Sequence, residues 1–167
     1  DSFYDGGRYG RTDAAVAHGV QLAADGAAVL DIGGESTRPG SESVPADEEL
    51  RRVVPVIEKL ANEVPVPISI DTSKATVARA ALDAGAVWVN DVSAGRFDTD
   101  MPSLAAARGC PVVLMHSRGV PRTMQRKPRY DDVLGEVKRE VEERSEAFVA
   151  AGVSDRNIII DPRTGFS

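Results

Sequence analysis

The sequence lacks several features that mark specialised classes of protein. It has one cysteine and two histidines in 167 residues, which excludes a disulfide framework and a metal centre rich in cysteine or histidine. No run of about 18 apolar residues is free of charge, so no membrane-spanning helix is expected. Acidic side chains exceed basic ones and give a net charge of −6, which argues against nucleic-acid binding. We therefore expect a globular protein of a reducing compartment, the cytoplasm, with neither membrane nor nucleic acid as a partner.

Five short apolar runs rich in β-branched residues predict strands. These runs cover residues 29–32, 66–70, 86–89, 112–115 and 158–160. Apolar residues at helical spacing lie between and before them, and predict helices. The helical patterns cover residues 12–24, 46–62, 74–84, 100–108 and 131–151. Thr12-Asp13 and Ser73 are the predicted N-caps of the first and third helices, and Pro55 predicts a kink in the second.

Strict alternation of helices and strands predicts an α/β protein with a parallel sheet. A doubly wound sheet and a (β/α)₈ barrel both satisfy this order. The chain opens on a loop that leads into a helix and ends soon after its last predicted strand. A complete barrel takes about 250 residues. We therefore expect residues 1–167 to form a single domain that is a fragment of a longer fold.

Polar side chains stand at or just beyond the C-terminal end of every predicted strand. These side chains are Glu35, Asp71, Asn90 with Asp91, His116 and Asp161. In a parallel α/β protein these ends share one face, where the loops build the active site. The alternative for each single residue is a helix cap. His116 is either an acid, a base or a ligand, or a hydrogen-bonded structural residue.

The loop at residues 33–40, Gly-Gly-Glu-Ser-Thr-Arg-Pro-Gly, is bracketed by glycines and carries hydroxyls and a guanidinium. Glycines allow close approach of the backbone to a ligand, and arginine favours an anion. A solvated turn explains the same composition. The basic segment at residues 117–130 is likewise interpreted as a solvated loop. Cys110 and Trp88 are interpreted as packing residues.

Several segments in order along the chain resemble the dihydropteroate synthase family of pterin-binding enzymes. The resembling segments are residues 1–7, 33–40, 69–72, 89–93, 114–116 and 161–162. The Gly-Gly-Glu-Ser-Thr-Arg-Pro-Gly block together with Ser-Ile-Asp-Thr is the most specific part of this resemblance.

The resemblance implies a (β/α)₈ barrel of which this chain holds strands two to six, without the first strand and the last two. It also implies the condensation of 6-hydroxymethyl-7,8-dihydropterin pyrophosphate with p-aminobenzoate to dihydropteroate and pyrophosphate in folate biosynthesis. Asp71 and Asp161 take catalytic roles by this resemblance. The implied pterin site comprises Asp71, Asn90, Val92, Met115, Asp161 and Phe166. The implied p-aminobenzoate loops contribute Ser2, Phe3, Thr37, Arg38 and Pro39.

The family also implies Mg²⁺ as cofactor, sulfonamides as inhibitors and a homodimer. Its metal-associated Asn belongs to a strand before residue 1, so no metal ligand is expected in this chain. One departure concerns the last loop, where Arg163 replaces a family glycine. Without the missing strands, the chain alone is expected to be inactive.

Two other readings fit part of the pattern. A pterin-binding methyltetrahydrofolate methyltransferase-like domain shares the barrel and the Asp/Asn contacts, but the loop at Ser36-Thr37-Arg38-Pro39 argues against it. A non-catalytic paralogue that keeps the barrel as a binding module is supported by Arg163.

Overall fold

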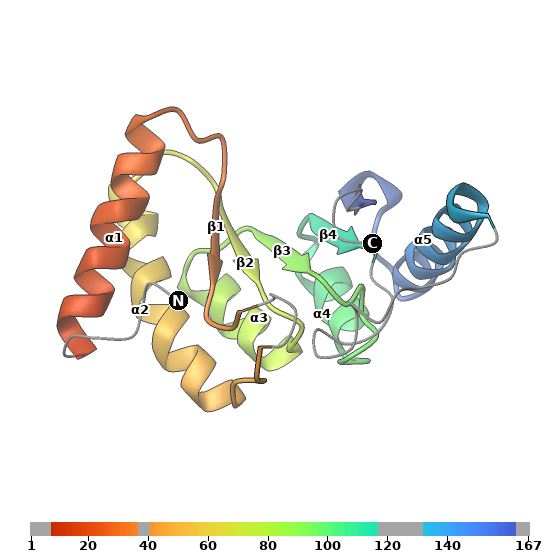
Figure 1. Cartoon of the computed structure of the whole chain (residues 1–167), viewed down its shortest axis with the longest axis horizontal. Helices are drawn as coiled ribbons and strands as arrows, with labels where there is room; N and C mark the ends of the chain where they lie inside the picture. The colour runs from red at the N-terminus through yellow and green to blue at the C-terminus, as the bar shows by residue number, and fades with distance from the viewer. Residues whose placement is uncertain (1–7, 37–40, 117–131, 163–167) are drawn as a thin grey trace.

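The fold is a five-stranded parallel sheet whose strands follow one another in chain order, β1-β2-β3-β4-β5 (Figure 1). The computed structural model describes residues 8–36, 41–116 and 132–162. The strands are β1 Leu30–Gly33, β2 Ile68–Asp71, β3 Trp88–Asp91, β4 Val112–Met115 and β5 Ile158–Asp161. The helices are α1 Arg8–Ala24, α2 Ala46–Glu63, α3 Ala75–Ala84, α4 Met101–Arg108 and α5 Val133–Ala150, with a short 3₁₀ helix at Asp155–Asn157.

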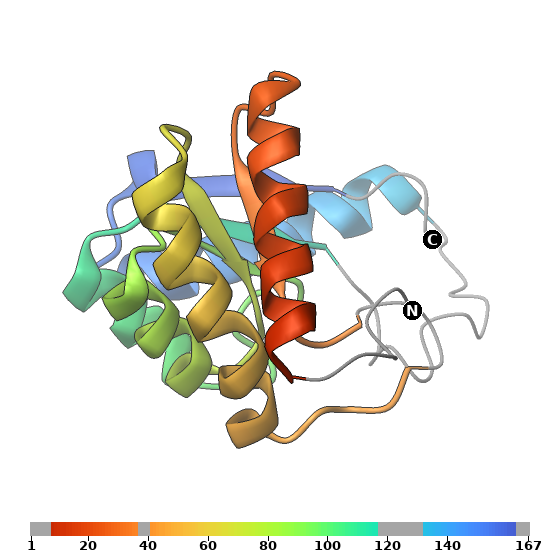
Figure 2. The same ribbon diagram turned by 90° about the vertical axis from the view of Figure 1, so that its left-hand side faces the viewer.

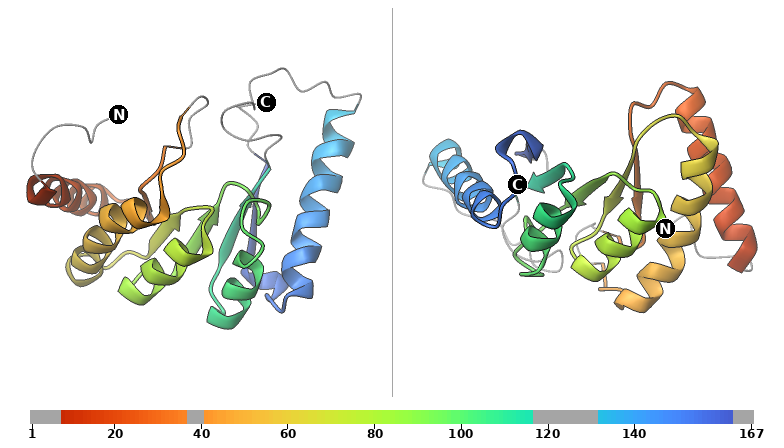
Figure 3. Two further views of the ribbon diagram at one scale, coloured as in Figure 1. Left: turned by 90° about the horizontal axis from the view of Figure 1, so that it is seen from below. Right: turned by 180° about the vertical axis from the view of Figure 1, so that it is seen from behind.

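This strand order decides between the two architectures that the sequence leaves open. A doubly wound sheet reverses its strand order at a switch point and carries helices on both faces. Here the order of the described strands follows the chain, and the helices stand in a row along one side of the sheet (Figure 3). The arrangement is that of successive βα units of a barrel, as the family resemblance implies.

The sheet has two faces of different character, because successive residues of a strand point to opposite sides. The helix face carries Leu30, Ile32, Ile68, Ile70, Val89, Asp91, Val112, Leu114, Ile158 and Ile160. It packs against the helices except at Ile160, which is exposed. The open face carries Asp31, Gly33, Ser69, Asp71, Trp88, Asn90, Val113, Met115, Ile159 and Asp161. The hydrophobic core lies between the helix face and the helices, so the second set is left for other contacts.

The core joins the sheet to apolar stripes of the helices. Ile57 and Leu60 of α2 and Phe148 of α5 are fully buried in it. Helix α1 lies beside α2 and β1 (Figure 2). Cys110 is a buried free thiol, as expected, whereas Trp88 is half-buried on the open face.

Two predicted helix ends are wrong. Helix α1 begins at Arg8, so Thr12 and Asp13 lie inside it and do not cap it. Helix α3 begins after Lys74, and its first N–H, that of Ala75, donates to Asp98 of a different loop at 2.7 Å. The cap is tertiary, which no local pattern could reveal. The second helix continues through Pro55.

Among the described residues, no helix combines the length and apolar character needed to cross a bilayer.

Candidate functional site

Three positions at the C-terminal ends of neighbouring strands stand side by side on the open face. Gly33 of β1 pairs in register with Asp71 of β2, and Asp71 pairs with Asn90 of β3. Both side chains are partly exposed. A carboxylate accepts two hydrogen bonds, whereas a carboxamide both donates and accepts. Together they match the mixed donor and acceptor edge of a flat heterocycle.

Asp31 fixes the orientation of the Asn90 carboxamide. Asn90 Nδ2 donates to Asp31 Oδ2 at 2.8 Å. An ionised carboxylate only accepts, so the amide nitrogen, not the amide oxygen, must face Asp31. Asn90 Oδ1 and the second N–H then remain for a ligand. The only sequence signal for Asp31 is its alternation with Leu30 and Ile32, which marks it as facing away from the core.

Gly33 keeps the space beside Asp71 clear. A Cβ atom built at Gly33 would lie 3.4 Å from Asp71 Cβ and 3.5 Å from Asp71 Oδ2. These are ordinary van der Waals distances, so a methyl group would fit, and only a side chain that extends beyond Cβ would approach the carboxylate more closely. The glycine of β1 thus has a steric role at the mouth of the sheet, beyond that of a turn residue.

Two more of the expected site residues lie on the same face, toward the other edge of the sheet. Met115 of β4 is in register with Asp161 of β5. The backbone N–H of His116 donates to the Asp161 carbonyl oxygen at 2.8 Å, which prolongs the pairing beyond β4. Val92 follows β3 directly and is 9% exposed. Asp71, Asn90, Met115 and Asp161 thus share the open face at the strand ends.

Asp91, next to Asn90, faces the helices instead. Its side chain is fully buried and holds the turn after β3. Oδ1 accepts from the N–H and the hydroxyl of Ser93, both at 2.8 Å, and Oδ2 accepts from the N–H of Gly95 at 2.7 Å. Burial raises the pKa of Asp91, against the opposing effect of these donors. Asp91 therefore serves the fold, and Asn90 is the residue of this pair that faces the site.

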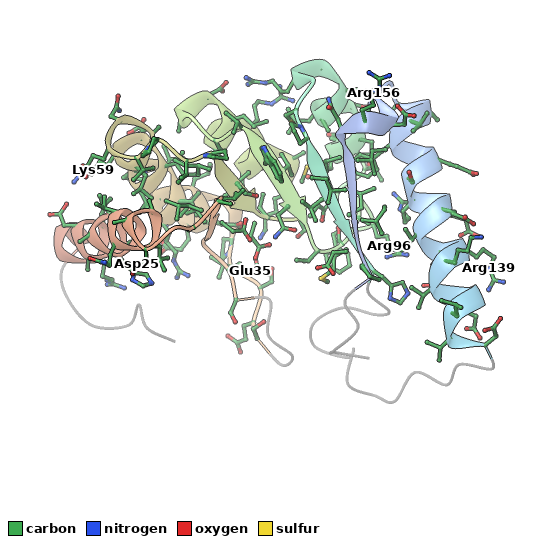
Figure 4. All side chains as sticks on the ribbon, turned by 90° about the horizontal axis from the view of Figure 1, so that it is seen from above. Asp25, Glu35, Lys59, Arg96, Arg139 and Arg156 are labelled. Atoms are coloured by element: carbon green, nitrogen blue, oxygen red, sulfur yellow. The ribbon has the colours of Figure 1, made fainter. Side chains whose placement is uncertain are left out.

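His116 is buried and takes the structural role that the sequence leaves as one alternative. Its Nε2 lies 3.1 Å from Glu140 Oε2 of α5. Arg96 lies 4.0 Å from the same carboxylate oxygen. These contacts hold α5 against the segments that follow β3 and β4, and Arg96 lies beside α5 in Figure 4.

Glu35, a predicted site residue after β1, does not join the row on the open face. It pairs with Lys74 and accepts from the N–H of Val44 at 3.2 Å. Lys74 also contacts Glu49 of α2, at 2.6 Å. Lys74 and Glu49 carry no local signal of this contact, because Lys74 follows β2 whereas Glu35 and Glu49 belong to the preceding β1–α2 unit.

Several expected site residues lie outside the described residues. They are Ser2, Phe3, Thr37, Arg38, Pro39 and Phe166, and the same holds for Arg163. Within the described residues, no cluster of three or more His, Cys, Asp or Glu side chains could hold a metal ion.

Comparison with known proteins identifies this arrangement. The pterin-binding enzyme family model matches residues 1–167. The dihydropteroate synthase of Bacillus subtilis is 46% identical over 167 residues, which is 100% of this chain and 56% of that protein.

Two solved structures agree with this match. The Xanthomonas albilineans dihydropteroate synthase with 4-aminobenzoic acid superposes with a TM-score of 0.90 at 51% identity, over 99% of this chain and 58% of that one. The Yersinia pestis dihydropteroate synthase with a sulfonamide drug gives a TM-score of 0.91 at 43% identity, over 99% of this chain and 60% of that one. The chain thus spans 56 to 60% of the length of these three proteins.

Proposed function

Because the chain belongs to the pterin-binding enzyme family, we propose that its function is that of a dihydropteroate synthase. The reaction transfers the methylene group of 6-hydroxymethyl-7,8-dihydropterin pyrophosphate to p-aminobenzoate. A C–N bond forms to the aromatic amine, the C–O bond to pyrophosphate breaks, and the amine loses a proton. The product is dihydropteroate, a precursor in folate biosynthesis.

The observation that carries the proposal is the row Gly33, Asp71 and Asn90 at the strand ends, with Asp31 bonded to the Asn90 amide at 2.8 Å. A pterin has a guanine-like edge with an amino group, a ring N–H and ring acceptors. An amide held in one orientation and a neighbouring carboxylate are complementary to such an edge.

Each residue has a proposed role in holding the pterin. Asp161 accepts from the exocyclic amino group and the ring N–H, in a bidentate pair. Asn90 matches an adjoining donor and acceptor, and Val92, Met115 and Phe166 line the apolar walls. Asp161 is fixed by the pairing of its backbone with His116, at 2.8 Å, and by its register with Met115.

Asp71 has a proposed electrostatic role in the reaction. Departure of pyrophosphate before attack leaves positive charge on the pterin methylene. A carboxylate already in place stabilises that charge without having to reorganise. Gly33 supports this role, since it leaves the carboxylate accessible. No covalent enzyme nucleophile is needed, because the aromatic amine is the nucleophile.

The second substrate and the inhibitors are proposed from the relatives. The Xanthomonas albilineans enzyme was solved with 4-aminobenzoic acid, and the Yersinia pestis enzyme with a sulfonamide drug. We assign the p-aminobenzoate site to Ser2, Phe3, Thr37, Arg38 and Pro39. Closure over this site would exclude water, which competes with the amine for the cation.

Three further features belong to the proposal. Mg²⁺ would neutralise the leaving pyrophosphate, and we assign it no ligand in this chain. A homodimer is the family expectation. A cytoplasmic location is compatible with Cys110, which is a free buried thiol.

A product assay tests this function on the complete protein that carries this sequence. Both substrates and Mg²⁺ should yield dihydropteroate, and a sulfonamide should compete with p-aminobenzoate. Asp161→Ala should abolish pterin binding in titration calorimetry, and an unchanged titration would defeat the assignment of Asp161. Pterin binding without any product would instead identify a non-catalytic member of the family.

A further inference from the structure

We propose that Lys74, Glu35 and Glu49 are positioning residues for the p-aminobenzoate side of the site, which rests on the function proposed above. The three charged side chains form one network that joins the loop after β1, the first turns of α2 and the loop after β2. The network, named here the loop anchor, holds the start of the segment that carries Thr37, Arg38 and Pro39.

The loop anchor is built around a partly buried lysine. Lys74 Nζ donates to Glu35 Oε2 and, at 2.6 Å, to Glu49 Oε2. The Glu49 side chain is 1% exposed, and those of Lys74 and Glu35 are 23% and 21% exposed. Burial lowers the pKa of Lys74, but the bonds to both carboxylates outweigh burial and leave that pKa raised. The lysine therefore carries its charge at neutral pH.

Each end of the anchor is tied to backbone that leads to the site. Glu49 Oε1 accepts from the Thr72 hydroxyl at 2.7 Å, and Thr72 follows Asp71 directly. Glu35 Oε2 accepts from the Val44 N–H at 3.2 Å, which links the two ends of the segment between residues 35 and 44. Arg52 of α2 adds a bond to the Gly34 carbonyl oxygen at 2.9 Å.

The position of Glu35 predicts that the loop anchor affects the two substrates differently. Asp71, Asn90 and Asp161 belong to strands of the sheet and are held by its register. Thr37, which we assign to the p-aminobenzoate site, follows Glu35 by only two residues in the sequence. Loss of the anchor should therefore displace the p-aminobenzoate contacts far more than the pterin contacts. General loss of folding would affect both substrates equally.

The test uses Lys74→Met with Lys59→Met as the matched control, in the complete protein. Lys59 pairs with Asp13 at 2.6 Å, but this pair is exposed and links α2 to α1, and Figure 4 shows Lys59 apart from Glu35. Lys74→Met should raise the KM for p-aminobenzoate about tenfold with little change in the KM for the pterin substrate. Lys59→Met should change neither constant.

A second variant covers the case in which Lys74→Met fails to fold. Glu35→Ala removes only the loop end of the anchor and leaves Lys74 paired with Glu49, and it should give the same selective rise in KM. Equal changes for both substrates, or unchanged constants in both variants, would overturn the inference while the proposed function stands. A wild-type protein that makes no dihydropteroate would instead defeat the proposed function.

Discussion

The two faces of the sheet carry opposite chemistry on the same strands. On the helix face of β2, Ile70 is fully buried in the core. The next residue, Asp71, lies on the open face beside Asn90. Strand β3 shows the same alternation, since Val89 is fully buried and Asn90 lies on the open face. Stability and the proposed ligand recognition thus belong to opposite sides of the same strand.

This division shows what can change independently. The helix face is covered by apolar contacts, so substitutions there act on the free energy of unfolding. On the open face, Asp71, Asn90 and Asp161 are partly exposed, so we expect their substitution to cost little folding free energy and to act on binding. Asp91 is the exception, a carboxylate on the helix face whose bonds build the turn after β3.

The largest effects on catalysis and on stability are expected from single substitutions at Asp71 and Ile70, which are adjacent in β2. Asp71→Asn should lower kcat/KM of the complete protein about hundredfold or more, because an amide cannot stabilise the positive methylene as a carboxylate does. Its midpoint of urea unfolding should stay close to that of the wild type. Steady-state kinetics and denaturant curves on the same preparations measure both properties.

Ile70→Ala is the reciprocal variant in this comparison. It should lower the free energy of unfolding by about 2–5 kcal/mol through lost burial and a cavity. The folded fraction should retain its pterin affinity. If Asp71→Asn destabilised the protein as much as Ile70→Ala, the division between the faces would not hold.

A tenfold effect is expected from Asp31→Asn on the open face. The new amide can donate or accept, so it no longer dictates which atom of Asn90 faces it. Pterin binding should weaken about tenfold, which corresponds to roughly one lost hydrogen bond. Titration calorimetry measures the change. Asp25→Asn is the control, because Asp25 accepts from Gln21 at the exposed end of α1, and unchanged affinity in both variants would remove Asp31 from the site.

The smallest expected effect concerns pH and the loop anchor. A raised pKa in the folded state means that the charge of Lys74 stabilises the fold fully below the unfolded pKa of about 10.4. This stability is lost as the pH rises through the higher folded pKa. Denaturant midpoints should therefore converge for wild type and Lys74→Met above about pH 10.5. A constant difference from pH 8 to pH 11 would contradict a titrating anchor.

Much of the fold was predictable because it is encoded locally. The apolar runs at residues 29–32, 66–70, 86–89, 112–115 and 158–160 coincide with the five strands within a few residues. The choice between barrel and doubly wound sheet was not predictable from the pattern, because strand order is a property of tertiary pairing. The predicted cap of α3 failed for a similar reason, since Asp98 caps α3 from another unit.

The candidate site likewise has a part that the sequence indicates and a part that only the structure reveals. Asp71, Asn90 and Asp161 could be named from the sequence, because strand ends of parallel units meet at one edge. The link between Asp31 and Asn90 could not, since the two residues are 59 positions apart and belong to strands that do not pair directly. The Lys74 network was equally hidden, because Glu49 lies in an amphipathic helix where acidic residues usually face solvent.

The bond between Asp31 and Asn90 also reports the bend of the sheet. The two residues sit on β1 and β3, with β2 between them, and in a flat sheet such strands are about 10 Å apart. Their side chains meet at 2.8 Å, which favours a surface that is concave on the side of the site. Flattening by a loosened helix layer would stretch this bridge early. The NMR signals of the Asn90 side-chain amide would then report changes in sheet curvature that are caused by repacking of the helices on the opposite face.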